Sequence, residues 1–177
     1  MKKKTLALVL ALTLLVAGVV GGTLAWLTDQ TAEVKNTFTV GDINIALTET
    51  TADYKMVPGN TIAKDPTVTV EANSEACWLF VKVTESTDLK DFITYAIAEG
   101  WTALPGVDGV YYREVPASAA DQTFSVLAGD AVTVKSDVTR TMLETAKTDA
   151  PTLTFKAYAI QKDHFATADA AWAEVSK

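Results

Sequence analysis

The sequence predicts an all-β fold, a jelly-roll-like two-sheet antiparallel sandwich with one or two short helices. Three observations support this prediction. About eight short stretches alternate apolar and polar residues and are separated by turn signals. Apolar spacing that indicates a helix rather than a strand is limited, after the N-terminal segment, to two brief segments near the C-terminus. The chain has 177 residues, enough for one domain with a substantial core.

The N-terminus has the pattern of a signal helix. Three lysines follow Met1, and Leu6 to Val20 is almost wholly Leu, Val and Ala. Gly21-Gly22 and Thr23-Leu24-Ala25 come next, so the segment ends on a small-x-Ala cleavage motif. We expect a signal peptide over residues 1–25, cut after Ala25, with Trp26 as the first mature residue. The alternative is an uncleaved membrane anchor, since the apolar run approaches the roughly 20 residues that span a bilayer.

The charge balance argues against two classes of partner. Loss of the three N-terminal lysines lowers the basic residues from 15 to 12, against 22 acidic residues. An acidic surface argues against binding to nucleic acid by phosphate neutralisation. It also argues against electrostatic docking on anionic lipid. We therefore expect no nucleic-acid partner, and contact with a membrane only through the uncleaved signal segment.

The first half of the mature chain divides into an arm and three strands. Residues 26–37 are mostly polar and predict an extended N-terminal arm, and residues 38–177 predict the β-sandwich domain. Residues 38–49 alternate, with Gly41 marking a bulge. A Pro-Gly turn lies at 57–60, and Val68 and Val70 alternate with threonines after it.

The strongest strand pattern begins at Cys77. Cys77, Leu79, Val81 and Val83 share one face, and the opposite face begins with Trp78 and Phe80. Apolar residues on both faces are typical of a central strand.

The second half continues with short elements. Residues 88–98 fit either a helix or a strand, because the apolar spacing suits both. The predicted elements that follow are a hairpin over 101–115, two strands around Ala128-Gly129-Asp130, a helix over 139–147, a strand over 151–161 and a helix over 167–175 with Thr167 as its N-cap.

Candidate catalytic residues are few. His164 is the only histidine and Cys77 the only cysteine, so a zinc site with two imidazoles on one helical turn is excluded. A nucleophilic pair of Cys77 and His164 needs a hydrogen-bond geometry that the sequence does not suggest. No phosphate-binding glycine loop or EF-hand spacing is present. We predict no catalytic residue, no metal and no cofactor, while a carboxylate pair or a loop-bound calcium ion stays open.

Two residue types leave alternatives open. Cys77 fits a small buried residue in a strand, or a thiol that is reactive or forms an intermolecular disulfide. The tryptophans fit core packing or a carbohydrate platform, and Trp26 and Trp101 are the two that core packing explains less readily.

The segment GGTLAWLTDQTAEVKNTFTVGDINIALTE resembles the start of the secreted TasA/camelysin family of Gram-positive bacteria, which a dedicated signal peptidase, SipW, processes. The matching residues are Gly21, Gly22, Thr23, Ala25, Thr28, Asp29, Asn36, Phe38, Gly41, Ile43, Ile45 and Leu47. The resemblance continues at Pro58, Gly59, Lys64, Val68, Asn73, Cys77, Trp78, Val81 and Val83. Asn60 and Cys77 stand where Asp and Ala are usual. The ending, Ala157 to Val175, is also similar.

The resemblance implies a jelly roll, export, and a role in biofilm matrix fibres. In such fibres the N-terminal arm of one subunit completes a sheet of the next, which is strand addition. The arm's Leu27, Ala32 and Val34 are then the candidate strand-donor residues. The expected partners are the chain itself or related matrix subunits, and the signal peptidase during export.

Two other classes remain open. One is a monomeric surface binding module, and the other is a camelysin-type metalloprotease, which a single histidine does not support.

Overall fold

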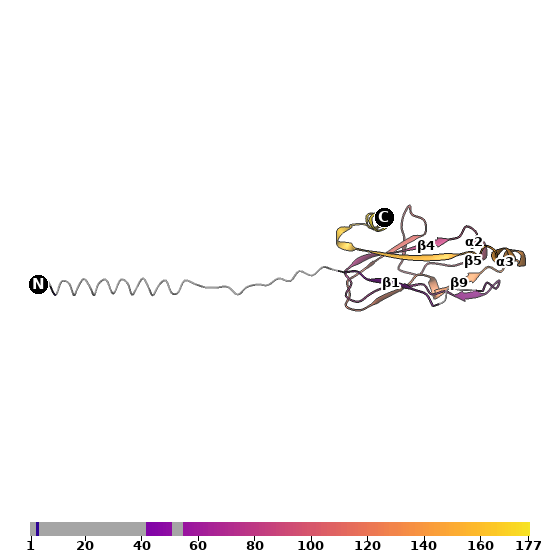
Figure 1. Ribbon diagram of the computed structural model, residues 1–177, viewed down its shortest axis with the longest axis horizontal. Coiled ribbons are helices and arrows are strands. Elements are labelled where there is room, and N and C mark those ends of the chain that lie inside the picture. Colours follow the sequence, from indigo (N-terminus) through magenta and orange to yellow (C-terminus); the bar gives the residue numbers. More distant parts are fainter. Residues whose placement is uncertain (1–2, 4–41, 51–54) are drawn as a thin grey trace. The chain divides into compact units, whose positions relative to one another are not determined.

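The computed structural model describes Lys3, residues 42–50 and residues 55–177 of the chain (Figure 1). The described residues form antiparallel sheets with a few short helices, which confirms the predicted all-β class. Their strands are β1 (Ile45–Thr48), β2 (Thr61–Ala63), β3 (Thr67–Val70), β4 (Cys77–Glu85), β5 (Ile93–Thr94), β6 (Thr102–Ala103), β7 (Val110–Val115), β8 (Gln122–Ser125), β9 (Ala131–Val134) and β10 (Leu153–Gln161). The helices are α2 (Leu89–Phe92), α3 (Arg140–Ala146) and α4 (Ala168–Val175), with short 3-10 helices η1 (Ala128–Asp130) and η2 (Lys162–His164).

The strands form two layers. One layer is a four-stranded sheet in the order β10-β4-β7-β6. The other layer contains the sheets β1-β3-β8 and β2-β9-β5. Figure 1 shows α2 and α3 gathered at one end of these layers, close to β5 and β9. This arrangement is sandwich-like, as the spacing of short strands predicts.

A bulge separates the two sheets of the second layer. Thr67 pairs with Ser125, whereas Ala63 pairs with Ala131. Residues 64–66 therefore lie opposite the longer segment 126–130, so the second strand carries two extra residues. Within this segment Gly129 and Asp130 have positive φ angles of 66° and 49°. Such insertions bend a strand and break its ladder, which explains why one layer contains two short sheets.

Strand β4 lies at the centre of the core. On its inner face, Leu79 and Val81 pack against Val68 and Val70 of β3, all at most 1% exposed. Its outer face is buried as well, with Phe80 fully buried. This confirms the prediction of a central strand with two apolar faces. Burial of each such side chain stabilises the fold by about 1.5–3 kcal/mol.

Helix α4 covers the outer face of β4 and β10. Ala171 is fully buried there, and the Trp172 ring lies 5.3 Å from the ring of Phe80 and 5.1 Å from that of Tyr158. The Thr167 side chain accepts a hydrogen bond from the backbone N–H of Ala170, as predicted for an N-cap.

A second core fills the end beyond the bulge. Leu127, Val132 and Val134 pack there against α2 and α3. Residues 88–98, which fit both helix and strand in sequence, contain both, since α2 runs directly into β5. The described part of the chain therefore has three short α-helices rather than the one or two predicted.

We expect Gly109→Ala to destabilise the domain by about 2 kcal/mol or more, because Gly109 has φ +71° and an added Cβ would lie 2.3 Å from the Val83 carbonyl oxygen. Gly106 of the same turn is the matched control. It has φ +73° but open space around an added Cβ, so Gly106→Ala should cost about 1 kcal/mol. Urea unfolding measures both values, and equal losses would contradict the predicted clash.

Candidate strand-acceptor edge

Strand β10 is an edge strand nine residues long. It pairs with β4 in an unbroken antiparallel register from Leu153↔Glu85 to Gln161↔Cys77. Among the described strands, none pairs with its other edge. An edge of this length is a ready acceptor for another strand, because its backbone N–H and C=O groups lack partners in the sheet.

The hydrogen bonds at the two ends of β10 show which of its residues face the free edge. The Ser86 N–H donates to the Thr152 carbonyl, and the Lys162 N–H donates to the Ala76 carbonyl, both at 2.9 Å. Because bonding alternates along an antiparallel strand, the even-numbered residues direct their backbone groups to β4. The odd-numbered residues direct theirs to the free edge, and these are Leu153, Phe155, Ala157, Ala159 and Gln161.

The same odd-numbered residues point their side chains into the sandwich. Phe155, Ala157 and Ala159 pack against the inner core but remain only half-buried, whereas the inner residues of β4 are nearly or completely buried. A strand added beside β10 would cover this half-buried apolar row. The edge therefore combines unpaired backbone groups with apolar surface that is still in contact with water.

Strand β1 is the edge strand of the facing layer, and it lies close to β10. The Glu71 N–H donates to the Asn44 carbonyl, so the alternation directs the backbone of Ile45 and Leu47 away from β3. Ile45 is half-buried, and the Leu47 side chain is 36% exposed. On this side of the sandwich, therefore, two strand edges that no other described strand pairs with lie close together.

A cavity of about 420 Å³ lies at the start of β10. Its lining is mostly apolar and includes Met56, Ile62, Ile93, Val132, Pro151 and Leu153. The cavity can hold an aliphatic side chain of a strand that follows the β10 edge.

An ion pair lies beside this cavity. The Lys64 ammonium is 2.6 Å from a Glu49 carboxylate oxygen and 5.4 Å from the centre of the Phe155 ring. Lys64 is only 7% exposed. Thr50 and Asp65, which follow Glu49 and Lys64 in the chain, are joined as well. The backbone N–H and the hydroxyl of Thr50 both donate to the Asp65 carboxylate. These hydrogen bonds lower the pKa of Asp65. The ion pair and the two hydrogen bonds together hold the chain after β1 against the junction of β2 and β3.

The Cys77 thiol is not accessible. Cys77 is completely buried at the start of β4, and burial raises its pKa to about 11. His164 is exposed, and no hydrogen bond joins these two side chains in the described structure. The environment of Cys77 fits the buried-residue alternative rather than the reactive thiol.

We expect a thiol reagent at pH 8 to label native Cys77 at least about a hundredfold more slowly than the unfolded chain. A pKa near 11 leaves about one thiol in a thousand ionised at this pH, and burial blocks access as well. Labelling in increasing urea measures the ratio. Equal rates in native and unfolded protein would contradict the burial of this residue.

The described tryptophans have structural contacts. The Trp78 indole N–H donates to the Phe165 carbonyl at 3.0 Å, and that of Trp101 donates to the Ser125 carbonyl at 2.9 Å. Trp172 packs between α4 and the sheet. Core packing therefore accounts for all three.

The structure does not place the site residues predicted from sequence. The cleavage residues Thr23, Ala25 and Trp26, and the donor residues Leu27, Ala32 and Val34, all lie outside the described residues. The acceptor edge itself was not predicted. Alternation indicated the strand over 151–161, but it carries no information about which neighbour a strand lacks.

Within residues 42–50 and 55–177, no three His, Cys, Asp or Glu side chains are grouped so as to hold a metal ion. The helices of this same part of the chain are too short or too polar to cross a bilayer. Comparison with protein-family models, curated proteins and solved structures finds no match to this chain.

Proposed function

We propose that the chain is a secreted structural subunit of an extracellular matrix or cell-surface fibre of the biofilm type, and that it assembles by donating its N-terminal arm to the next copy. The carrying observation is the nine-residue free edge of β10, with its half-buried apolar inner row. The resemblance of the N-terminal segment to the TasA/camelysin family is the sequence support.

The lengths of donor and acceptor agree. An extended strand rises about 3.3 Å per residue, so the predicted arm of residues 26–37 reaches about 40 Å. The nine residues of β10 span about 30 Å on the same rise. The arm can therefore follow the whole edge. In an extended arm Ala32 and Val34 would share one face and are candidates to cover the apolar row, whereas Leu27 would lie on the opposite face.

A role for cleavage follows from this proposal. While residues 1–25 hold the chain in the membrane, the arm beside them cannot reach a neighbour's edge. Removal of the signal segment by a SipW-type peptidase frees the arm, so assembly begins outside the cell. We also propose the jelly-roll arrangement for the domain. The two-layer antiparallel architecture with β4 at the centre supports it.

The experiment compares two forms of the chain, one starting at Trp26 and one starting at Phe38, by size exclusion and electron microscopy over several days. Both forms keep every residue of the described cores. We expect fibres or ladders of oligomers from the first form only.

If both forms stay monomeric, self-assembly through the arm is overturned and a monomeric binding module is favoured. Retention of glycans by the protein would then test that function. If both forms assemble equally, the arm is not needed for fibre assembly. Proteolysis by the pure protein that a chelator abolishes would instead support the metalloprotease class.

A further inference from the structure

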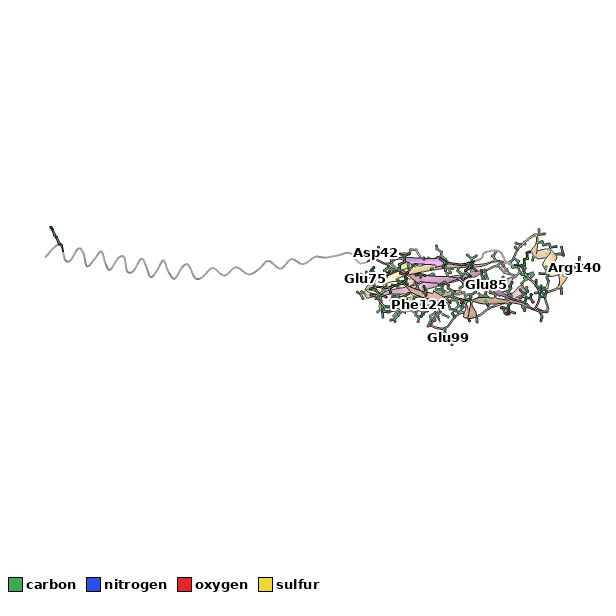
Figure 2. The ribbon with its side chains drawn as sticks, turned by 90° about the horizontal axis from the view of Figure 1, so that it is seen from below. Asp42, Glu75, Glu85, Glu99, Phe124 and Arg140 are labelled. Atoms are coloured by element: carbon green, nitrogen blue, oxygen red, sulfur yellow. The ribbon has the colours of Figure 1, made fainter. Side chains whose placement is uncertain are left out.

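Charged residues lie at both ends of the domain. Asp42 and Glu75 lie at one end, and Arg140 lies at the opposite end (Figure 2). The first end is formed by the start of β1, the turn over 71–76 and the loop over 116–121, which hydrogen bonds join. The Glu75 N–H donates to the Asp42 carbonyl at 3.0 Å, and the Ala72 N–H donates to the Asp121 carboxylate at 2.8 Å.

This first end, here called the acidic end, has exposed carboxylates around a small apolar loop. Asp42, Glu71, Glu75 and Asp121 are all exposed. The loop between β7 and β8 reads Pro-Ala-Ser-Ala-Ala-Asp over residues 116–121, and its Pro and Ala residues are exposed as well. These segments contain no lysine or arginine. The acidic end therefore combines an exposed, largely apolar loop with carboxylates beside it.

The opposite end carries an open cavity of about 630 Å³ beside α3, here called the α3 pocket. Its apolar lining includes Met56, Val138 and Leu143, and its cations are Lys55, Arg140 and Lys147. Glu144 is the one carboxylate among the described lining residues, and it pairs with Lys147 at 2.8 Å. Among the described lining residues the three cations outnumber the one carboxylate, in a chain that is acidic overall.

From this double complementarity we infer that the α3 pocket binds the acidic end of a second copy of the chain. The apolar loop over 116–121 fits the apolar lining, and the carboxylates of Glu71 and Glu75 fit the cations of Lys55 and Arg140. Contact between two different surfaces of the same subunit is heterologous, and because the two surfaces lie at opposite ends of the domain, it would extend a row of subunits head to tail. The inference adds a second contact to the proposed fibre and rests on that function only for its biological setting.

The test uses the chain that starts at Phe38, which lacks the arm, so strand donation cannot contribute. Amide chemical shifts are followed by NMR up to about 1 mM protein at low salt, where exposed charges are least screened. We expect concentration-dependent shifts confined to residues 71–76, 116–121 and the α3 pocket. Raising the salt to about 0.5 M should lower the association at least fivefold, because the charges are then screened.

Two charge reversals distinguish this contact from others. Glu71→Lys with Glu75→Lys changes the acidic end, and Lys55→Glu with Arg140→Glu changes the α3 pocket. Each double variant alone should associate at least tenfold more weakly than the parent chain. An equimolar mixture should recover association, since one variant keeps an intact pocket and the other an intact acidic end. Lys82→Glu with Lys156→Glu changes two exposed, neighbouring lysines of β4 and β10. This variant is the matched control and should associate like the parent.

Absence of concentration-dependent shifts at the two ends of the parent chain would overturn the inference. So would self-association of either double variant at the parent's strength. The fibre comparison between chains starting at Trp26 and Phe38 tests strand donation separately, so failure of one proposal is distinguishable from failure of the other.

Discussion

Ala157→Pro is expected to abolish fibre formation while leaving the subunit folded. The backbone of Ala157 faces the free edge of β10, so proline removes an N–H that β4 does not use. We expect a cost of about 1 kcal/mol to the free subunit, from the restricted φ of proline in a strand. A donated strand would lose a hydrogen bond in the middle of its ladder and meet the proline ring.

Lys156→Pro is the matched control one residue earlier. The backbone of Lys156 faces β4, so proline there removes a bond within the subunit, and we expect a loss of about 3 kcal/mol or more. Urea unfolding and electron microscopy of both variants provide the comparison. Normal fibres from a folded Ala157→Pro chain would show that the β10 edge is not the acceptor.

Phe80→Ala is expected to cause a large loss of stability, about 3–5 kcal/mol. Phe80 is fully buried on the outer face of β4, and its ring packs 6.3 Å from Tyr112 and 5.3 Å from Trp172. Its removal opens a cavity under α4 and weakens the attachment of that helix. Urea unfolding followed by circular dichroism measures the change.

Leu47→Ala is the comparison for Phe80→Ala. Leu47 is also an apolar strand residue, but it is 36% exposed. We expect it to cost less than about 1 kcal/mol. A loss at Phe80 no larger than the loss at Leu47 would contradict the packing of α4 on the sheet.

The elements that sequence predicted best are those with strong periodicity or clear caps. Alternation over Cys77–Val83 located β4 and identified it as central, since both of its faces begin with large apolar residues. Thr167 and the helical spacing after it located α4. In these segments local preference and tertiary packing agree.

Other features depend on contacts between distant segments. The bulge at 126–130 is defined by pairing with residues 64–66, so a local Gly-Asp turn signal could not reveal it. Arg113 alternates with Tyr111 and Val115 and therefore faces inward, where its guanidinium lies 3.9 Å from the centre of the Phe124 ring. Burial lowers the pKa of Arg113. A charged residue in an alternating strand is usually assigned to the solvent face. The exception is explained by the rings of Phe124 and Trp101, the second of which lies 5.3 Å from the same guanidinium.

The acceptor edge illustrates the same limit. The residues of β10 show which side chains face the core, because that depends on alternation alone. Which backbone groups remain unpaired depends on the order of strands in the sheet, and this order is a property of the whole fold.

The most direct test of strand donation to β10 is amide hydrogen exchange, measured residue by residue in the free subunit and in the fibre. We predict that the amides of Phe155, Ala157 and Ala159 exchange quickly in the subunit and at least about a hundredfold more slowly in the fibre, because a donated strand then pairs with them. The amides of Lys156 and Tyr158 bond to β4 and should be protected in both states. Fibres in which Phe155, Ala157 and Ala159 exchange as quickly as in the free subunit would contradict the account.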